Sequence, residues 1–202
     1  MWYIVECEED ACLYYGFSRE ISKEELRRRI QDETILEVLN RVPVRKGDVF
    51  FIEAGTVHAI GKGIVLAEIQ QNSNVTYRVY DYGRVGADGK KRDLHIEKAL
   101  DVADRNPKVR SESFTPHLGR CQYFSVDKLV LDGKTLRKIE GTVDEDSFLH
   151  LLILDGEGCV CSENKVDFRK GDSLLLTAST GIFEIQGTCE ALLTTIPGEA
   201  SL

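Results

Sequence analysis

Three side chains between positions 58 and 78 have types and spacing that could do acid–base or metal chemistry. His58 follows an apolar strand pattern in KGDVFFIEAGTVHAIGKG, and Glu68 and Arg78 come ten and twenty residues later. An imidazole can bind a metal, a carboxylate can accept a proton, and a guanidinium can stabilise a developing anion. The less specific alternatives are a hydrogen-bonded structural histidine and an arginine that pairs with Asp81 or Glu68.

The other residues able to bind a metal are few and scattered. Of the three remaining histidines, His95 falls in a predicted helix, His117 in a connector and His150 in a later strand. Cys159-Val160-Cys161 is a weak zinc signal, because alternate residues of a strand share a face. Both cysteines could equally be small core residues or surface thiols.

Composition restricts the class of partner. The 202 residues carry a net charge of −8 with a pI near 5.1, which argues against nucleic acid and anionic membranes. A phosphorylated small molecule remains a candidate, and Lys90, Lys91 and Arg92 could contact its phosphate, although such a loop is commonly only solvated. No apolar run is long enough to span a membrane, and the acidic N-terminus is unlike a signal peptide. Six scattered cysteines suit reduced thiols in the cytoplasm.

The first half of the chain mixes strand and helix patterns. Apolar bursts in residues 1–17 predict a hairpin with an acidic turn. Ser22 followed by Glu25 is a capping box, so a helical insertion is expected over about 22–42, ending before Pro43. Strand patterns then run from position 49 to 82 and include VTYRVYDY, and a short helix is expected over about 93–104.

The second half is dense in short strands broken by glycine turns, which predicts a sandwich or barrel. Residues 106–119 are rich in Ser, Pro and Gly and form a candidate boundary. We therefore expect two domains, residues 1–110 with the helical insertions and residues 111–202.

An internal repeat supports two similar subdomains. Arg45-Lys46-Gly47-Asp48 and the strand that follows recur 124 residues later as Arg169-Lys170-Gly171-Asp172 and a second apolar strand. At the position of His58 the second copy has Ile182, which cannot bind a metal.

The spacing of Gly47, Gly55 and His58 resembles the second motif of the cupin superfamily, with Glu53 where many cupins have proline. The resemblance implies two antiparallel, jelly-roll β-barrels, of which the first holds a divalent metal. It also implies that the second barrel is a degenerate, metal-free cupin, because Ile182 replaces the histidine.

MWYIVE, EIQQNSNVTYRVYDYGR and LHIEKALD together resemble the short bacterial form of type I mannose-6-phosphate isomerase. In that family a glutamine, two histidines and a glutamate bind zinc. The resemblance identifies His58 with the last histidine and Arg78 with the catalytic arginine. It places the other three ligands before Met1, so we expect an incomplete first barrel, weak zinc binding, and a truncated chain of low or no activity.

The expected parent activity is the interconversion of mannose 6-phosphate and fructose 6-phosphate through an enediol. Glu68 is a candidate base, and Arg78 a candidate stabiliser of the enediolate. The alternative is a degenerate cupin that binds a sugar phosphate without catalysis, and a weaker one is a structural remnant. The residues do not select one hexose phosphate or fix the oligomeric state, although exposed strand edges could lead to self-association.

Overall fold

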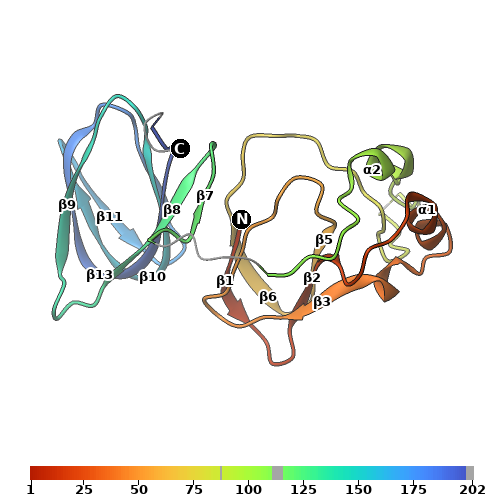
Figure 1. Cartoon of the computed structure of the whole chain (residues 1–202). Helices are drawn as coiled ribbons and strands as arrows, with labels where there is room; N and C mark the ends of the chain where they lie inside the picture. Colours follow the sequence, from red (N-terminus) through yellow and green to blue (C-terminus); the bar gives the residue numbers. More distant parts are fainter. Residues whose placement is uncertain (87, 111–115, 199–202) are drawn as a thin grey trace. The chain divides into compact units, whose positions relative to one another are not determined.

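The computed structural model describes residues 1–86, 88–110 and 116–198. Contacts divide the chain into two compact units, Met1–Ser111 and Glu112–Leu202, which are considered separately here (Figure 1). Part of the predicted connector, residues 111–115, lies outside the described residues. The chain is mainly β, as predicted from its strand patterns.

Unit 1 contains two antiparallel three-stranded sheets (Figure 1). The first sheet has the order β4 (Val49–Phe50), β1 (Trp2–Cys7), β6 (Ile64–Glu68). The second has the order β3 (Leu39–Pro43), β2 (Cys12–Phe17), β5 (His58–Ile60). The predicted hairpin over residues 1–17 is therefore wrong. The two strands exist, but they pair with later strands in different sheets, because each can bury its apolar residues only against the facing sheet.

The helical insertion is shorter than predicted. It consists of α1 (Lys23–Gln31) and the 3₁₀ turn η1 (Ile35–Glu37). The Ser22 hydroxyl accepts a hydrogen bond from the Glu25 amide at 3.0 Å, so the predicted N-cap is confirmed. Glu33 has φ +57°, which ends the helix, and the last residues of the predicted helix belong to β3 instead.

The predicted strand VTYRVYDY is also wrong. Residues 75–82 are extended or irregular, without a strand partner, and lead to α2 (Ile96–Val102), which lies inside the predicted helix range. The Arg78 amide donates to the His95 ring at 3.1 Å rather than to a neighbouring strand. This segment has high strand propensity but does not form a strand, because its backbone does not pair with the edge of a described sheet.

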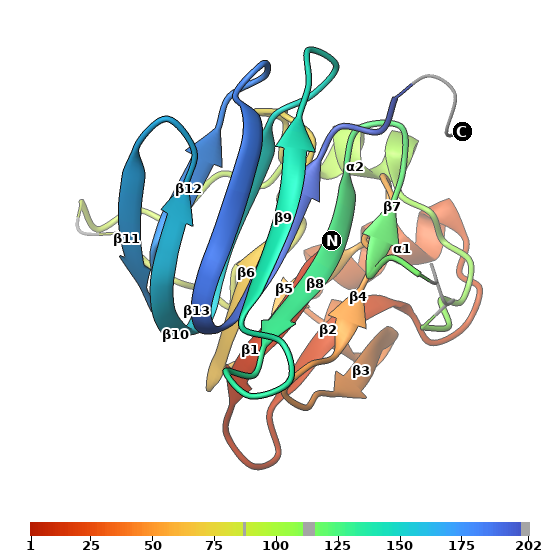
Figure 2. The same ribbon diagram turned by 90° about the vertical axis from the view of Figure 1, so that its left-hand side faces the viewer.

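Unit 2 has one seven-stranded antiparallel sheet assembly (Figure 2). Its strands are β7 (Gly119–Arg120), β8 (Ser125–Leu131), β9 (Lys138–Val143), β10 (Leu149–Cys161), β11 (Lys165–Arg169), β12 (Ser173–Leu176) and β13 (Gly181–Thr195). The long strands β10 and β13 pair over most of their length, and apolar residues on their inner face, such as Leu151 and Ile185, form the core. The cupin-type, jelly-roll arrangement is present, but the pairings of the described strands do not close a barrel in either unit.

The internal repeat is reproduced in hydrogen-bonding detail. The Gly47 amide donates to the Ile4 carbonyl at 2.8 Å, and the Gly171 amide donates to the Ile153 carbonyl at 2.9 Å. The two glycines have φ of +89° and +90°. The strand register shifts just after Ile4 in β1 and just after Ile153 in β10. Two segments that fold into the same turn against equivalent strands show that the units share a local architecture.

Among the described residues, no helix is long and apolar enough to cross a membrane.

Candidate functional site

The candidate site lies between the two sheets of unit 1. The rings of Trp2 on β1 and His58 on β5 meet edge to face, with centroids 5.1 Å apart, so this contact joins one sheet to the other. Tyr15 pairs with His58 across β2 and β5, and its hydroxyl donates to the Phe51 carbonyl of the first sheet at 2.8 Å. The face of β5 that carries His58 is therefore directed toward the facing sheet.

The hydrogen bond of His58 defines its protonation pattern. Its Nδ1 lies 2.7 Å from the Thr56 carbonyl oxygen, which can only accept, so Nδ1 carries the proton. In the neutral ring Nε2 then holds a lone pair. Histidines that bind metals or accept protons are commonly oriented by this kind of bond to a backbone carbonyl. The exposed ring of His58 is thus both oriented and open at Nε2.

Glu68 is beside this pair in register. It lies directly opposite Trp2 in the β1–β6 ladder, so the two side chains share a face of the sheet. Trp2 is 3% exposed and its indole Nε1 has no hydrogen-bond partner, and neither has the buried Thr56 hydroxyl. Buried polar groups are normally satisfied by protein or ordered water, so these two unpaired groups are candidates for hydrogen bonds to water or to a bound ligand.

Arg78 is held by its backbone rather than by an acid. Its amide donates to His95 Nδ1 at 3.1 Å, and the His95 amide donates back to the Arg78 carbonyl at 2.8 Å. The guanidinium donates to the Asp93 carbonyl at 3.3 Å, and the Asp81 carboxylate is occupied by Arg92. Arg78 therefore keeps donors for an anion.

Helix α2 links the two halves of the candidate site. His95 at its N-terminal end fixes Arg78, while beyond its C-terminal end the Asp104 amide donates to the Gly55 carbonyl at 2.9 Å. Gly55 has φ +87°, and a Cβ there would lie 2.6 Å from the Val102 carbonyl oxygen. A helix of seven residues is roughly 10 Å long. The turn before His58 is attached at one end of α2 and the backbone of Arg78 at the other, so the two attachment points are about that far apart.

Two of the three cations proposed for phosphate contact, Lys91 and Arg92, lie beside carboxylates. Arg92 binds the Asp81 carboxylate with two hydrogen bonds, which lowers the pKa of Asp81, and Lys91 lies 3.5 Å from Glu33. The Lys90 backbone forms a turn with Gly86. These contacts order the loop, and a phosphate role for the three cations stays a prediction.

Unit 2 provides an internal comparison for the site. The matched turns make Leu151 the counterpart of Trp2, and Leu151 pairs with Leu193 as Trp2 pairs with Glu68. His58 corresponds to Ile182, which is 76% exposed. All three polar or aromatic positions are aliphatic in unit 2, so the same architecture there lacks these functional groups.

Zinc is the metal that the resemblance implies, and the described residues do not provide a complete site for it. Within residues 1–86, 88–110 and 116–198, no three His, Cys, Asp or Glu side chains are grouped to hold a metal ion. A catalytic zinc usually has three protein ligands. His58 has the orientation of a ligand, but we assign no step to a metal.

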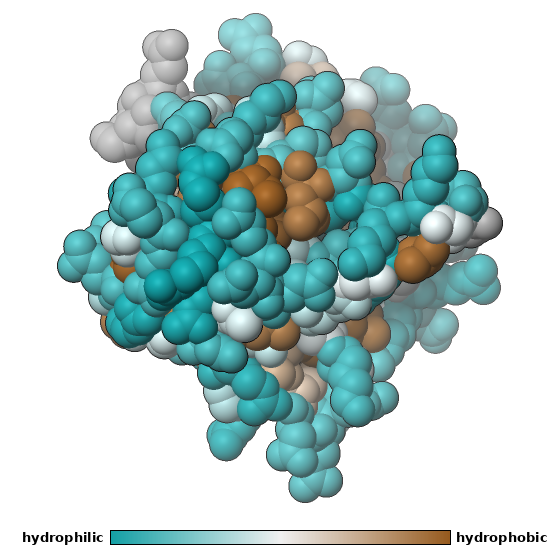
Figure 3. All heavy atoms as spheres, turned by 90° about the vertical axis from the view of Figure 1, so that its right-hand side faces the viewer, coloured by the Kyte–Doolittle hydropathy of each residue, from teal (hydrophilic) through white to brown (hydrophobic). Residues whose placement is uncertain are grey.

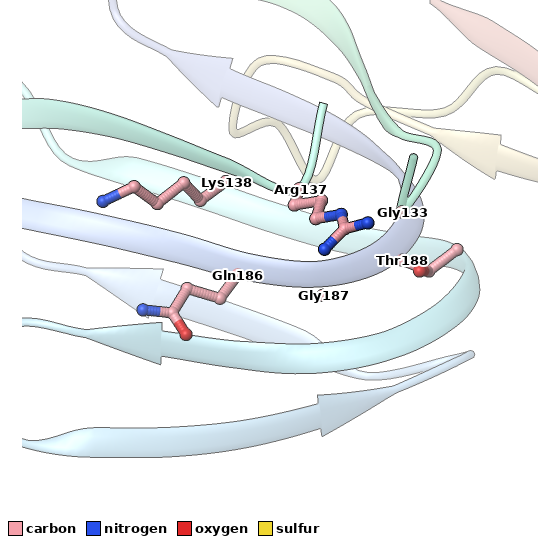
Figure 4. A pocket seen from close by; sticks show the side chains of 6 residues that line it. All are labelled: Gly133, Arg137, Lys138, Gln186, Gly187 and Thr188. Carbon is pink, nitrogen blue, oxygen red and sulfur yellow. The ribbon is translucent and has the colours of Figure 1, made fainter. Parts of the chain in front are cut away.

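Each unit also has a notable surface feature. A shallow pocket of about 390 Å³ in unit 2 is lined by Gly133, Arg137, Lys138, Gln186, Gly187 and Thr188 (Figure 4). The face of unit 1 that carries α1 and α2 is mostly hydrophilic, with a small apolar patch (Figure 3). The residues that line the pocket do not include those that the sequence predicts for chemistry.

The paired jelly-roll sheets and the histidine after the glycine turn are those of a cupin-type protein. Residues 115–196 match the family model described as "Mannose-6-phosphate isomerase, cupin domain". This match lies in unit 2, where the motif resemblance was weaker. The likeness in unit 1 comes from whole-chain comparison.

The chain is 40% identical over 202 residues to mannose-6-phosphate isomerase ManA of Bacillus subtilis, covering 95% of this chain and 62% of that protein. It is 36% identical over 200 residues to mannose-6-phosphate isomerase of Streptococcus mutans, covering 95% and 61%. The chain thus spans less than two thirds of the length of these relatives. Its resemblance to the short bacterial isomerases is confirmed.

Solved structures agree with this resemblance. The mannose 6-phosphate isomerase of Bacillus subtilis matches with a TM-score of 0.82 and 33% identity, covering 96% of this chain and 63% of that one. The apo enzyme of Salmonella typhimurium matches with a TM-score of 0.66 at 15% identity, covering 98% and 66%. The second likeness shows the fold alone.

Sequence reasoning missed three contacts that shape the site. Trp2 is a buried core residue, and its ring is also the surface against which His58 rests. Thr56 orients His58, and His95 fixes Arg78. The short spacing of Thr56 from His58 could have indicated the first contact, whereas the other two need the fold.

Proposed function

We propose that this chain acts on a hexose 6-phosphate and interconverts mannose 6-phosphate and fructose 6-phosphate, in a reducing cytoplasm. The carrying observation is the whole-chain likeness to mannose-6-phosphate isomerases of known sequence and fold, reaching 40% identity. The oriented imidazole of His58 and the available guanidinium of Arg78, both in unit 1, support the same function. All six cysteines are free thiols, which suits the proposed compartment.

The reaction moves a proton between C1 and C2 of the sugar, and negative charge develops on an oxygen in between. Arg78 is proposed to stabilise that enediolate, since its charge is permanent and its backbone is fixed at both ends. Glu68 is proposed as the base, because an exposed carboxylate on the inner face can reach a carbon-bound proton. By family resemblance, His58 is proposed to be one zinc ligand through Nε2; without a metal, the same lone pair can accept a hydrogen bond from a substrate hydroxyl.

Binding without catalysis is the second candidate function. The described residues contain no assembled group of three metal ligands, and this observation favours a sugar-phosphate-binding cupin over an efficient enzyme. We therefore expect slow turnover from this chain alone. Both functions require the same substrate contacts, so one experiment can separate them.

The test is a coupled assay of fructose 6-phosphate formation from mannose 6-phosphate, with and without added zinc, alongside calorimetric titration of the same chain. Turnover that is lost in Glu68→Gln supports the isomerase. Saturable binding without turnover supports the binding function. If the chain neither binds nor converts mannose 6-phosphate, with or without zinc, both proposals fail.

A further inference from the structure

Unit 2 holds two thiols in contact that the proposed isomerase chemistry does not use. Cys159 and Cys161 stand two residues apart on β10, and their sulfur atoms are 3.8 Å apart. Cys159 is 8% exposed and Cys161 is half-buried. Both thiols are free.

These thiols lie on the polar outer face of the sheet. Cys159 is flanked across the ladders by Asp167 and Gln186, and Cys161 by Lys165 and Glu184. Residues between them in sequence, such as Val160, point to the apolar core on the other face. Gln186, opposite Cys159 in the ladder, extends in the same direction as Lys138 (Figure 4), and Cys161 is the partly exposed member of the pair.

The separation of the two sulfur atoms distinguishes a metal site from a disulfide. A disulfide needs a sulfur–sulfur bond of about 2.05 Å, with Cα atoms usually closer than about 6.8 Å. Residues two apart in a strand are separated by about that limit, and β10 is held by ladders on both sides. A metal bound to two sulfurs at about 2.3 Å in tetrahedral geometry places them roughly 3.8 Å apart, as observed here.

Charged side chains surround the two thiols: Lys165, Asp167 and Glu184 lie on the neighbouring strands. Lys165 lies 3.2 Å from Asp167, and its ammonium favours the thiolate form of Cys159. Burial and the neighbouring Cys161 act in the other direction and raise the pKa of Cys159.

We propose that Cys159 and Cys161 form a two-thiolate site for a thiophilic d¹⁰ cation of the zinc or cadmium class. The divalent cation forms two metal–sulfur bonds and two protons leave to solvent, so no oxidant is needed. Because the described residues hold no assembled group of three ligand side chains, water completes the coordination. The site is independent of His58 and of the isomerase proposal.

The test is titration of the reduced, metal-free chain with Cd²⁺, following the thiolate-to-cadmium charge-transfer absorption. We expect one equivalent to bind, and Cys159→Ser and Cys161→Ser each to weaken binding by at least about tenfold. Cys121→Ser removes another half-buried thiol and should leave the titration unchanged. Far-ultraviolet circular dichroism checks that every variant is folded.

Three results would overturn the site. The absorption band could be absent from the reduced chain, or it could persist in the folded double variant Cys159→Ser/Cys161→Ser. Alternatively, Cys121→Ser could remove the band while either single variant of the pair keeps it.

Discussion

At the scale of single residues, the site depends on which polar groups the fold leaves open. His58 has its Nδ1 occupied by the Thr56 carbonyl and its Nε2 available, while Arg78 has fixed backbone groups and available side-chain donors. In unit 2 the positions that correspond to His58, Trp2 and Glu68 are the aliphatic residues Ile182, Leu151 and Leu193. These differences, rather than the shared architecture, assign the proposed chemistry to unit 1.

Arg78→Lys tests the role of the guanidinium. A lysine keeps the charge but loses the planar donor array, so we expect kcat/KM to fall about 100-fold where turnover is measurable, and mannose 6-phosphate binding to weaken. Arg84→Lys is the matched control, since Arg84 is exposed in the same loop and rests on the Tyr82 ring. Equal activity of Arg78→Lys and Arg84→Lys would show that Arg78 has no such role.

His95 is expected to be a positioning residue for Arg78. His95→Ala removes the acceptor of the Arg78 amide, so turnover and substrate binding should fall as in the Arg78 variant. His95→Asn offers an oxygen acceptor and can cap α2, so it should recover much of the loss. Calorimetry and the coupled assay measure both effects. Failure of His95→Asn to exceed His95→Ala would contradict the positioning role.

At the scale of elements, the Gly55 turn joins β5 to α2. Gly55→Ala adds a Cβ at φ +87° and 2.6 Å from the Val102 carbonyl oxygen, so it combines backbone strain with a steric clash. We expect a loss of about 2–4 kcal/mol in the free energy of unfolding of unit 1. Gly171→Ala, at φ +90° with nothing within 4 Å, isolates the strain alone and should cost less. Denaturant unfolding compares the two, and equal losses would mean that the contact with α2 is unimportant.

The partly buried ammonium of Lys108 supports the same turn. Lys108 binds Glu53 at 2.6 Å and Asp104 at 3.0 Å, and these carboxylates raise the pKa of Lys108. The Glu53 side chain is 61% exposed, so a double-mutant cycle of Glu53→Gln and Lys108→Met should give only about 0.5–1 kcal/mol of coupling. A raised lysine pKa stabilises the fold below the unfolded value and loses that contribution as pH rises through the folded value. The coupling should therefore persist at neutral pH and vanish above about pH 10.4. Undiminished coupling in strong alkali would refute this assignment.

Local signals predicted those elements that depend on neighbours in sequence. The Ser22 cap and the repeated turns at Gly47 and Gly171 formed as expected, because each contains a hydrogen bond between residues three apart: Ser22 with Glu25, Arg45 with Asp48, and Arg169 with Asp172. The pairing of β1 and β2 with other strands could not be predicted, since a strand pattern does not identify its partner. The strand predicted at residues 75–82 was wrong for the same reason. Its strand propensity was high, but the Arg78 amide donates to the His95 ring instead of to a neighbouring strand.

At the scale of the whole molecule, the two units share a turn architecture, and their side chains divide the proposed functions. The residues that the resemblance singled out lie in unit 1, while the family model matches unit 2. We propose that His58 and Arg78 serve one substrate. The proposal rests on the hydrogen bonds that attach the turn before His58 and the backbone of Arg78 to the two ends of α2. The sequence indicated these residues only through motif spacing, because their orientation depends on partners far along the chain.

The most direct test uses the fluorescence of Trp2, the single tryptophan in the chain, whose ring contacts His58. Adding mannose 6-phosphate should change this fluorescence saturably, with the same midpoint as calorimetric binding, and Arg78→Lys should shift both midpoints upward together. Calorimetric binding that leaves the Trp2 fluorescence unchanged, in a folded chain, would place the substrate away from His58 and contradict the account.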